Sequence, residues 1–146
     1  MIQVSAIVPV FNGESTIAAA IDSVLNQNFD ATEVIVINDG STDGTALILR
    51  SYGSKIRVIE QSNRGVSAAR NAGAAIARGE YLAFLDADDE WLPGKLAKAI
   101  LALDRNAAPQ ACSRGHRVTS LRASTSRARW PQSRIDAAAA IPRSSC

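Results

Sequence analysis

The sequence predicts an α/β protein with a Rossmann-like, mostly parallel sheet covered by helices on both faces. Short apolar runs rich in β-branched residues alternate four times with segments of helical periodicity. This alternation is typical of parallel sheets with helical crossovers. Polar residues gather directly after each apolar run, and parallel sheets bind their ligands beyond the carboxyl ends of the strands. With 146 residues, the chain is long enough for one domain with a hydrophobic core.

The first strand is predicted over residues 4–10, and Pro9 is expected to end its regular pairing because proline has no backbone N–H. A turn at 11–13 leads into a helix over 17–25. Two residues with hydroxyl groups are candidate caps for this helix, Ser15 and Thr16. The apolar positions follow helical spacing and are Ile17, Ile21, Val24 and Leu25.

A second buried strand is predicted over 34–37, and it stops at the dense turn signal of 38–41. A helix follows, for which Thr42 or Asp43 is the candidate cap. Its inward positions are expected to be Ala46, Leu49 and Tyr52.

The third strand is predicted over 56–60 and is interrupted by charged residues. An alanine-rich helix follows over 66–78, with Gly79 placed as its C-terminal stop. A fourth buried strand is expected over 81–85, and a last helix over 92–103. That helix has one apolar face, formed by Leu96, Ile100 and Leu103.

The net charge of +2 conceals two regions of different composition. Residues 1–105 carry nine Lys/Arg and thirteen Asp/Glu (9 − 13 = −4), whereas 106–146 carry seven Arg and one Asp (7 − 1 = +6). In the second region Ala, Arg and Ser supply 23 of the 41 residues. We therefore predict a domain over 1–105 and a disordered, loosely packed or non-native tail over 106–146. The abrupt change would fit a frameshifted or truncated reading frame, which is a hypothesis.

Several classes of protein are disfavoured by the sequence. No apolar stretch approaches the roughly 20 residues of a membrane span, and the start of the chain does not resemble a signal peptide, so the cytoplasm is the expected compartment. The late residues Cys112, Cys146 and His116 give neither a disulfide framework nor a zinc site. A dinucleotide oxidoreductase is disfavoured because no Gly-x-Gly-x-x-Gly follows the first strand.

The acidic group after the fourth strand is the clearest candidate site. Asp86 and Asp88 lie two residues apart at the end of an extended segment, so their carboxylates point the same way. With Asp89 beside them they repel one another unless a cation joins them. A hard divalent cation would do so, and would offset the charge of a bound diphosphate. The alternative is a solvated acidic turn that caps the next helix.

Three further residues have two interpretations each. Asp39 follows a buried strand, where its carboxylate could accept a hydrogen bond from a nucleotide base. Alternatively, the turn that contains Asp39 could serve only to begin the next helix. Gly40 allows the chain to turn tightly there. Phe11 could lie against a base, although its residue type alone favours the core. Arg70 could form a surface salt bridge or contact a phosphate or loop.

Four segments together resemble the successive motifs of family 2 glycosyltransferases of the GT-A fold, in the family's order and spacing. The resemblance covers about residues 3–105 and rests on Val8–Glu14, Asn38–Thr45, Asn63–Asn71 and Phe84–Asp89. It implies a truncated GT-A domain that holds a nucleotide-diphosphate sugar.

The resemblance also implies roles for individual residues. The nucleotide pocket would be lined by Pro9, Phe11, Asn12 and Glu14. Asp39 would contact the base, usually uracil, and Arg70 and Asn71 would shape the pocket near the ribose and phosphates. Within Asp86-Ala87-Asp88, Asp86 would sit by the ribose and sugar, and Asp88 would ligate Mn²⁺ or Mg²⁺. Asn38 departs from the pattern, because many family members have Asp there.

A catalytic base is missing from this pattern. Family members place a carboxylate well downstream, where it deprotonates the acceptor hydroxyl and permits displacement with inversion. Beyond Asp89 and Glu90 the chain offers only Asp104 and Asp136, and neither is a convincing base. Arg129-Trp130 resembles a later family motif superficially, without its surroundings.

The sequence therefore predicts a glycosyltransferase domain that binds a nucleotide-sugar donor, probably a UDP-sugar, together with Mn²⁺ or Mg²⁺. The acceptor is left open among saccharide, lipid and protein, and so is peripheral association with a membrane. One alternative is an inactive truncated remnant that at most binds nucleotide. Another is a nucleic-acid binder that uses the arginine-rich tail, although no nucleic-acid partner is expected because no recognisable binding module is present.

Overall fold

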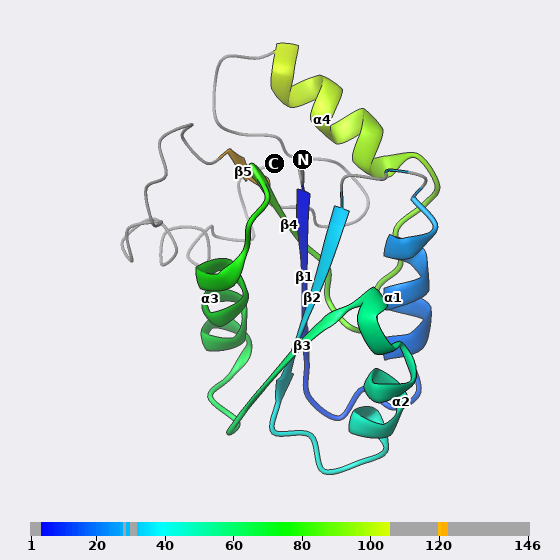
Figure 1. The fold of residues 1–146 in the computed structure, drawn as a ribbon, viewed down its shortest axis with the longest axis vertical. Helices are drawn as coiled ribbons and strands as arrows, with labels where there is room; N and C mark the ends of the chain where they lie inside the picture. Colours follow the sequence, from blue (N-terminus) through cyan, green and yellow to red (C-terminus); the bar gives the residue numbers. More distant parts are fainter. Residues whose placement is uncertain (1–3, 28, 30–31, 106–119, 123–146) are drawn as a thin grey trace, which may run out of the picture.

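In the computed structural model, a five-stranded sheet has helices on both of its faces (Figure 1). The structure describes residues 4–27, 29, 32–105 and 120–122, with side chains as far as residue 100. The strand order is β3-β2-β1-β4-β5. The first four strands are parallel and the fifth is antiparallel, which confirms the predicted fold class. The strands are β1 (Val4–Val10), β2 (Thr32–Asp39), β3 (Arg57–Gln61), β4 (Tyr81–Phe84) and β5 (Ser120–Arg122).

The helices divide between the two faces of the sheet. They are α1 (Ile17–Leu25), α2 (Thr45–Ser51), α3 (Val66–Ile76) and α4 (Lys95–Arg105), with a short 3-10 turn at Gly53–Lys55. Figure 1 shows α3 on one side of the sheet and α1 and α2 on the other. The buried side chains Leu96 and Ile100 of α4 belong to the same apolar cluster as α1, so α4 completes the layer on that side.

The two-residue period of the strands creates these two layers. Along β1, Val4, Ala6 and Val8 pack in the cluster that holds the buried face of α1, whereas Ile7 packs with Ala69 of α3. The same alternation runs through β2 and β4. Both faces of these strands are therefore buried, which explains why they read as continuous apolar runs. Each fully buried Ile or Leu contributes about 1.5–3 kcal/mol.

Element boundaries differ from the predictions where tertiary contacts extend or cut short an element. The second strand continues to Asp39, because Asn38 and Asp39 still pair with β3. The third helix ends at Ile76, with extended Ala77 after it. Gly79 is not its stop; a Cβ there would lie 2.5 Å from the Ser5 backbone nitrogen, so glycine allows the chain to pass β1 closely.

Some expected helix features are also corrected. The last helix begins at Lys95 rather than at Leu92, which is 68% exposed. Leu25 is 39% exposed rather than inward. Thr16 occupies the N-cap position of α1, but its side chain makes no capping hydrogen bond. Asp43 does serve the start of α2, because its Oδ1 accepts a hydrogen bond of 3.0 Å from the Thr45 N–H.

Pro9 ends the pairing of β1 on one side only. The strand continues to Val10 and stays in register with β2, whereas its register with β4 ends at Ile7. The Ile7 carbonyl faces β4, since it accepts a hydrogen bond of 3.0 Å from the Leu85 N–H. Alternate residues face the same edge of a strand, so the missing N–H of Pro9 falls on the β4 side, where it would be needed to continue the ladder. The expectation that Pro9 ends regular pairing is therefore confirmed towards β4 and wrong towards β2.

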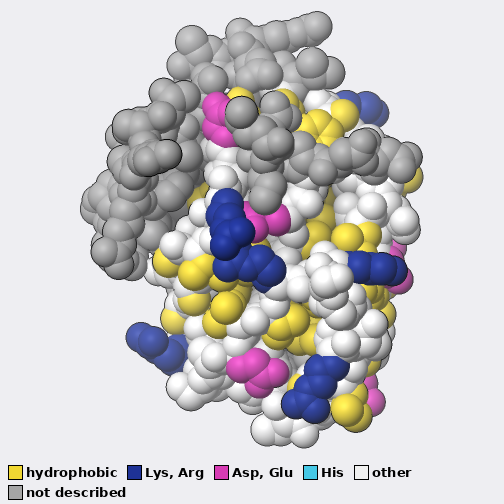
Figure 2. Space-filling view, in the orientation of Figure 1, with side chains coloured by type: hydrophobic (Ala, Val, Ile, Leu, Met, Phe, Trp, Pro, Cys, Tyr) yellow, Lys and Arg dark blue, Asp and Glu magenta, His cyan; other side chains and the backbone are white. Residues whose placement is uncertain are grey.

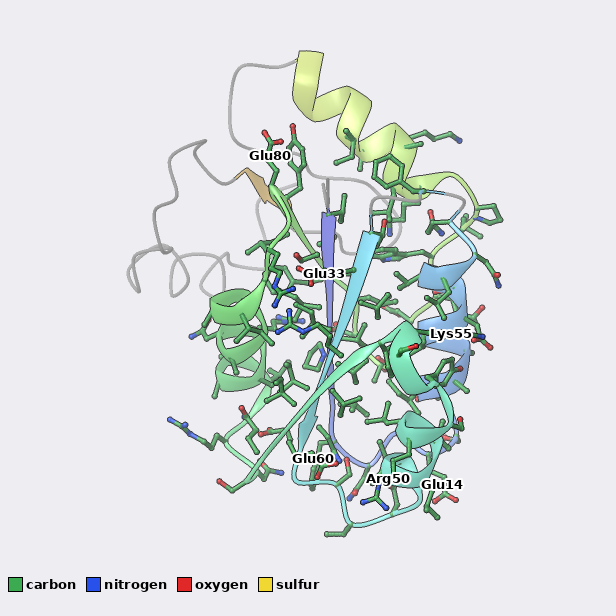
Figure 3. All side chains as sticks on the ribbon, in the orientation of Figure 1. Glu14, Glu33, Arg50, Lys55, Glu60 and Glu80 are labelled. Atoms are coloured by element: carbon green, nitrogen blue, oxygen red, sulfur yellow. The ribbon has the colours of Figure 1, made fainter. Side chains whose placement is uncertain are left out.

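A polar network joins the amino ends of the strands, at the opposite end of the sheet from Glu14 (Figure 3). The Glu33 carboxylate accepts hydrogen bonds from Ser5 Oγ at 2.5 Å, from the Arg78 N–H at 2.6 Å and from Arg57 Nη1 at 3.3 Å. Burial by itself would raise the pKa of Glu33, but these hydrogen bonds and the charge of Arg57 outweigh it and lower the pKa. The network fixes the passage from α3 into β4.

The region after residue 105 contributes one described element. Ser120–Arg122 forms β5, antiparallel to β4, which the composition of this region did not predict. The other expectations for 106–146 lie outside the described residues, among them the proposed disorder and the roles considered for Cys112, His116 and Asp136. The side chain of Leu103 is likewise outside them.

Two surface properties bear on partners. Among the described residues, none of the helices is long and apolar enough to cross a membrane. On the face shown in Figure 2, the described Lys and Arg side chains lie singly or in small groups, with apolar and uncharged surface between them. Where that face is formed by described residues, it shows no broad basic surface of the kind that follows a nucleic-acid backbone.

Candidate functional site

The candidate site lies where the carboxyl ends of β1 and β4 meet. From β1 the chain moves outward through α1 to β2 and through α2 to β3; it then returns through α3, on the opposite face, to β4. After β4 the chain also passes to the α1 side, where Trp91 and Leu96 pack in the same cluster as α1. Ligands of parallel sheets bind beyond the carboxyl ends of the strands, and we use the word crevice for the expected ligand region between the loops that follow β1 and β4. The two loops approach each other closely, because a Cβ on Gly13 would lie 3.7 Å from the Ala87 Cβ.

The loop after β1 is hydrogen-bonded to the loop after β2. Backbone N–H groups of the first loop donate to side chains of the second: Asn12 to Ser41 Oγ (2.9 Å), Gly13 to Thr45 Oγ1 (3.0 Å) and Glu14 to Asp43 Oδ2 (3.1 Å). We call this contact between residues 12–14 and 41–45 the loop clasp. It makes one unit of two segments that are about 30 positions apart in sequence.

The same clasp is reinforced in the reverse direction by two predicted site residues. Asn12 Oδ1 accepts a hydrogen bond of 2.8 Å from the Thr42 N–H, and Glu14 Oε2 accepts one of 3.0 Å from the Gly44 N–H. Asn12 has a φ of 51°, a left-handed conformation that asparagine tolerates better than most residues. The structure therefore places both side chains in a contact between loops rather than pointing freely into a pocket.

Asp39 ends β2 and is 3% exposed. Its Oδ1 accepts hydrogen bonds from Gln61 Nε2 (2.7 Å) and the Arg64 N–H (2.9 Å), and its Oδ2 accepts one from the Gly65 N–H (2.8 Å). Burial alone would raise the pKa of Asp39, but these hydrogen bonds and the charge of Arg64 lower it. Gly65 is the N-cap residue of α3 and has no side-chain cap, so Asp39 supplies the anion that a helix N-terminus favours.

These contacts limit what Asp39 can offer a ligand. A carboxylate has about four lone-pair positions, and three are taken by the hydrogen bonds to Gln61, Arg64 and Gly65. Room remains for one further donor on Oδ2. Gly40, with a φ of 78°, makes the tight turn expected after Asp39.

Three apolar or small residues among the predicted site residues differ in their exposure. Phe11 is 51% exposed, so the interpretation that it fills the core is wrong. Pro9 lies one residue before the end of β1. Ala87 is partly buried and packs against the core cluster of the α1 side. An exposed aromatic ring beside a crevice offers a surface on which a planar group can stack.

Arg70 and Asp86 form an ion pair between α3 and the segment after β4. Their side chains are 29% and 34% exposed, and the Arg70 guanidinium also lies 6.0 Å from the centre of the Phe84 ring. Arg70 therefore forms the salt bridge expected from one interpretation. Its partner, Asp86, is itself a predicted site residue, so the salt bridge also places Arg70 beside the candidate site. Arg70 Nε is buried without a partner among the described residues, and the next residue, Asn71, is half-buried on α3.

Asp88 differs from Asp86. It is exposed, and we find no hydrogen bond or ion pair to it from the residues that the structure describes. Among those residues, no group of three or more Asp, Glu, His or Cys side chains gathers to hold a metal ion. The donor set still fits Mg²⁺ or Mn²⁺ in one mode, in which one or two carboxylates and the phosphates of a substrate share the ion.

Two residues that were not predicted from the sequence hold the segment after Asp88: Ser23 of α1, and Gln27 two residues beyond its end. Ser23 Oγ accepts a hydrogen bond from the Trp91 N–H (3.0 Å), and Gln27 Nε2 donates to the Leu92 carbonyl (3.0 Å). A signal was present for Gln27, because it continues the buried stripe of Ile17, Ala20, Ile21 and Val24 at helical spacing. A polar residue on a buried stripe requires a partner.

Comparison with known proteins decides the family. A family model described as glycosyl transferase family 2 matches residues 5–141, which is most of the chain. The chain belongs to glycosyl transferase family 2. The family resemblance stated from the sequence is thereby confirmed, and the GT-A fold expected from it is the fold of the solved structures that this family member resembles.

Curated relatives place the match within longer proteins. The uncharacterized glycosyltransferase YibD of Escherichia coli is 40% identical over 94 residues, which are 62% of this chain and 27% of YibD. The uncharacterized glycosyltransferase EpsJ of Bacillus subtilis is 46% identical over 89 residues, which are 59% of this chain and 26% of EpsJ. This family member thus spans less than a third of the length of these relatives.

Two solved structures show the same architecture. S. aureus TarS 1-349 in complex with UDP-GlcNAc matches with a TM-score of 0.63 and 29% identity, covering 80% of this chain and 36% of TarS 1-349. The mannosyltransferase PcManGT from Pyrobaculum calidifontis, in complex with GDP-Man and Mn²⁺, matches with a TM-score of 0.69 and 23% identity, covering 82% and 44%. The second likeness shows the fold alone.

Proposed function

We propose that this chain is the donor-binding part of a glycosyltransferase that takes a UDP-linked sugar together with Mn²⁺ or Mg²⁺. One observation carries the proposal: exposed Phe11 and unpaired Asp88 follow β1 and β4, whose carboxyl ends form the crevice. A ring available for stacking and a carboxylate available for a cation suit the two ends of a nucleoside diphosphate. The likeness to TarS, solved with UDP and with UDP-GlcNAc, supports uridine as the nucleoside.

Each remaining residue of the proposed site has a role that fits its contacts. The free lone pair on Asp39 Oδ2 accepts one N–H of the base. Arg70 neutralises Asp86, so that two nearby carboxylates do not both repel a diphosphate, and the partly exposed guanidinium of Arg70 can attract a phosphate oxygen. Pro9, Asn71 and Ala87 shape the walls of the pocket. Asn12 and Glu14 act through the loop clasp, which holds Phe11 in place.

Asp88 is the proposed metal ligand. When bound, a divalent cation neutralises the diphosphate as it leaves the sugar. Transfer with inversion would form a bond between an acceptor oxygen and the sugar carbon as the bond to the diphosphate breaks, and a base would take the proton of the acceptor hydroxyl. We assign no base among the described residues. The acceptor, whether saccharide, lipid or protein, and any peripheral contact with a membrane depend on the whole protein.

A remnant that binds nucleotide without transferring sugar is the second candidate. It is favoured because none of the described residues is assigned as the base that transfer requires. Turnover of a UDP-sugar by this chain alone, measured as release of UDP, would exclude it.

Calorimetric titration of the 146-residue chain with UDP, with and without MnCl₂ or MgCl₂, tests the proposal. We expect the metal to increase affinity for UDP, and Asp88→Ala to remove about tenfold or more of that gain. Glu90→Ala is the matched control, because it removes the same charge from the same exposed segment. Equal affinity with and without metal in the parent chain would reject the role of Asp88.

A further inference from the structure

The segment Asp86–Glu90 concentrates charge of one sign. It carries four carboxylates in five residues, and only part of this charge is offset within the protein. Arg70 pairs with Asp86, and Lys95 is attracted to Asp89. Like charges this close repel one another and disfavour a compact arrangement. Something in the fold must therefore hold the segment in place before any cation reaches Asp88.

The upstream end of this segment is held by the sheet. The Leu85 N–H donates to the Ile7 carbonyl at 3.0 Å, which extends the ladder between β1 and β4 by one hydrogen bond. A turn follows at once, in which the Asp89 N–H donates to the Asp86 carbonyl at 3.0 Å. The downstream end has no strand to hold it, since α4 begins only at Lys95.

The downstream end is held instead by a buried amide at the end of α1. Gln27 is 4% exposed. Its Nε2 donates to the Leu92 carbonyl at 3.0 Å and to the Ser23 carbonyl at 2.9 Å, with the Trp91 carbonyl at 3.4 Å as a weaker third partner. Its Oε1 accepts a hydrogen bond of 3.1 Å from the Leu96 N–H. One side chain thereby satisfies backbone groups on both sides of Pro93 and Gly94.

Ser23, one helical turn earlier on α1, adds a second attachment through its hydrogen bond from the Trp91 N–H. Trp91 itself is 3% exposed and belongs to the core cluster of the α1 side. The residue three positions after Asp88 is therefore fixed by packing and by hydrogen bonds to α1.

We propose that Gln27, assisted by Ser23, is a positioning residue for the metal-binding carboxylate. Its buried amide fixes the downstream end of Asp86–Glu90, so that Asp88 is presented to the cation in a preorganised geometry and not ordered by the cation at a cost in affinity. Gln27 itself touches neither donor nor metal. The inference rests on the proposed donor binding, but the attachment of Trp91 can be measured without any ligand.

The first measurement is the accessibility of Trp91. The chain has two tryptophans, Trp91 and Trp130, so Trp130→Phe leaves Trp91 as the only fluorophore of this kind. In that background we expect Gln27→Ala to increase acrylamide quenching of Trp91 about twofold or more, because loss of the buried attachment lets the segment open. Asn26→Ala, an exposed amide at the adjacent position, is the control and should leave quenching unchanged.

Gln27→Met separates hydrogen bonding from packing. Methionine keeps nearly the volume of glutamine but makes none of its hydrogen bonds. An effect of Gln27→Met therefore comes from the lost hydrogen bonds and not from an empty space in the core. We expect Gln27→Met to increase quenching as Gln27→Ala does. Quenching unchanged from the parent in Gln27→Met would overturn the proposal, because packing alone would then suffice.

The second measurement is the gain in UDP affinity on adding MnCl₂, by calorimetry. We expect both Gln27 variants to lose about tenfold of that gain, with affinity for UDP alone unchanged and Asn26→Ala like the parent. If the variants expose Trp91 yet keep the full gain, positioning of Asp88 is refuted. If the parent binds no UDP, the proposed function fails, and the quenching result alone decides whether Gln27 holds the segment.

Discussion

The loop clasp and the segment Asp86–Glu90 lie on adjoining loops of one crevice, yet they handle polar side chains in opposite ways. In the clasp, the carboxylates of Glu14 and Asp43 accept backbone N–H groups of the facing loop. In the acidic segment, Asp88 is exposed and without a partner among the described residues. The first region is closed by its own hydrogen bonds, whereas the second is held from outside, by α1 and by Arg70.

This difference teaches that segments from which pocket residues were predicted mix side chains already bound within the protein with side chains that have no partner among the described residues. Asn12, Glu14 and Asp88 all belong to motifs from which pocket residues were predicted. The structure shows what the first two bind within the protein. A carboxylate satisfied by backbone N–H groups is expected to affect stability first, and an unpaired one is expected to affect ligand binding first.

The largest effect should come from exchanging Asp39 and Asp88 separately. We expect Asp39→Ala to lower the free energy of unfolding by about 2–3 kcal/mol, because the Arg64 and Gly65 N–H groups lose their acceptor. Asp88→Ala should change it by less than about 0.5 kcal/mol. Asp39 lies outside the loop clasp but is satisfied by backbone N–H groups in the same way. Urea unfolding of both variants measures the two losses, and equal losses would mean that satisfied and unpaired carboxylates do not differ in their effect on stability.

Glu14 provides a finer test within the clasp. Glu14→Ala removes the acceptor for the Gly44 N–H and should cost about 0.5–1 kcal/mol of stability. Glu14→Gln keeps an acceptor oxygen and should cost less. Amide hydrogen exchange at Gly44 reports the bond directly, and we expect faster exchange in the alanine variant. Unchanged exchange there would show that Glu14 does not hold the loop.

The ion pair between Arg70 and Asp86 is intermediate between the two regions, since it gives one carboxylate of the acidic segment a partner within the protein. A double-mutant cycle with Arg70→Ala and Asp86→Ala should give a coupling of about 0.5 kcal/mol in unfolding, because both side chains are partly hydrated. The coupling should weaken at high salt. A coupling that does not respond to salt would indicate packing against Phe84 and not charge.

Low pH should reduce the stability of the chain gradually, through protonation of the carboxylates that accept hydrogen bonds within the protein. The folded-state pKa of Asp39 is lowered, so its contribution to stability is fully present above the unfolded pKa of about 3.9 and is lost as pH falls through the lower folded value. We therefore expect the stability of the parent chain to approach that of Asp39→Asn as the pH falls below about 3.9. A difference that stays constant over this range would contradict the assigned hydrogen bonds.

Much of the fold could be predicted from the sequence, because its strands are buried on both faces. Val4–Val10 was predicted to the residue, since an apolar run between a clear start and a turn leaves little choice. The errors lie where a distant partner decides. The pairing of Asp39 with Gln61 lengthened β2, and the contact of Gly79 with Ser5 replaced a helix stop. Neither partner is visible in local periodicity.

The candidate site was predictable in place and less so in detail. Four polar strand ends indicated the crevice, and the acidic group stood out by charge. The hydrogen bonds of Asn12 join residues about 30 positions apart, which no spacing rule predicts. Gln27 could have been found, because a buried stripe position occupied by an amide calls for partners; what those partners are depends on the fold.

Pro9 marks the level at which β1 and β4 part. It is buried, and its nitrogen faces the β4 edge without a hydrogen, so it cannot continue the ladder past the bond from the Leu85 N–H to the Ile7 carbonyl. β1 itself goes on to Val10 beside β2. The chain after Leu85 is thereby released from the sheet and turns at once. One proline thus sets the boundary between the rigid sheet and the acidic segment that follows it.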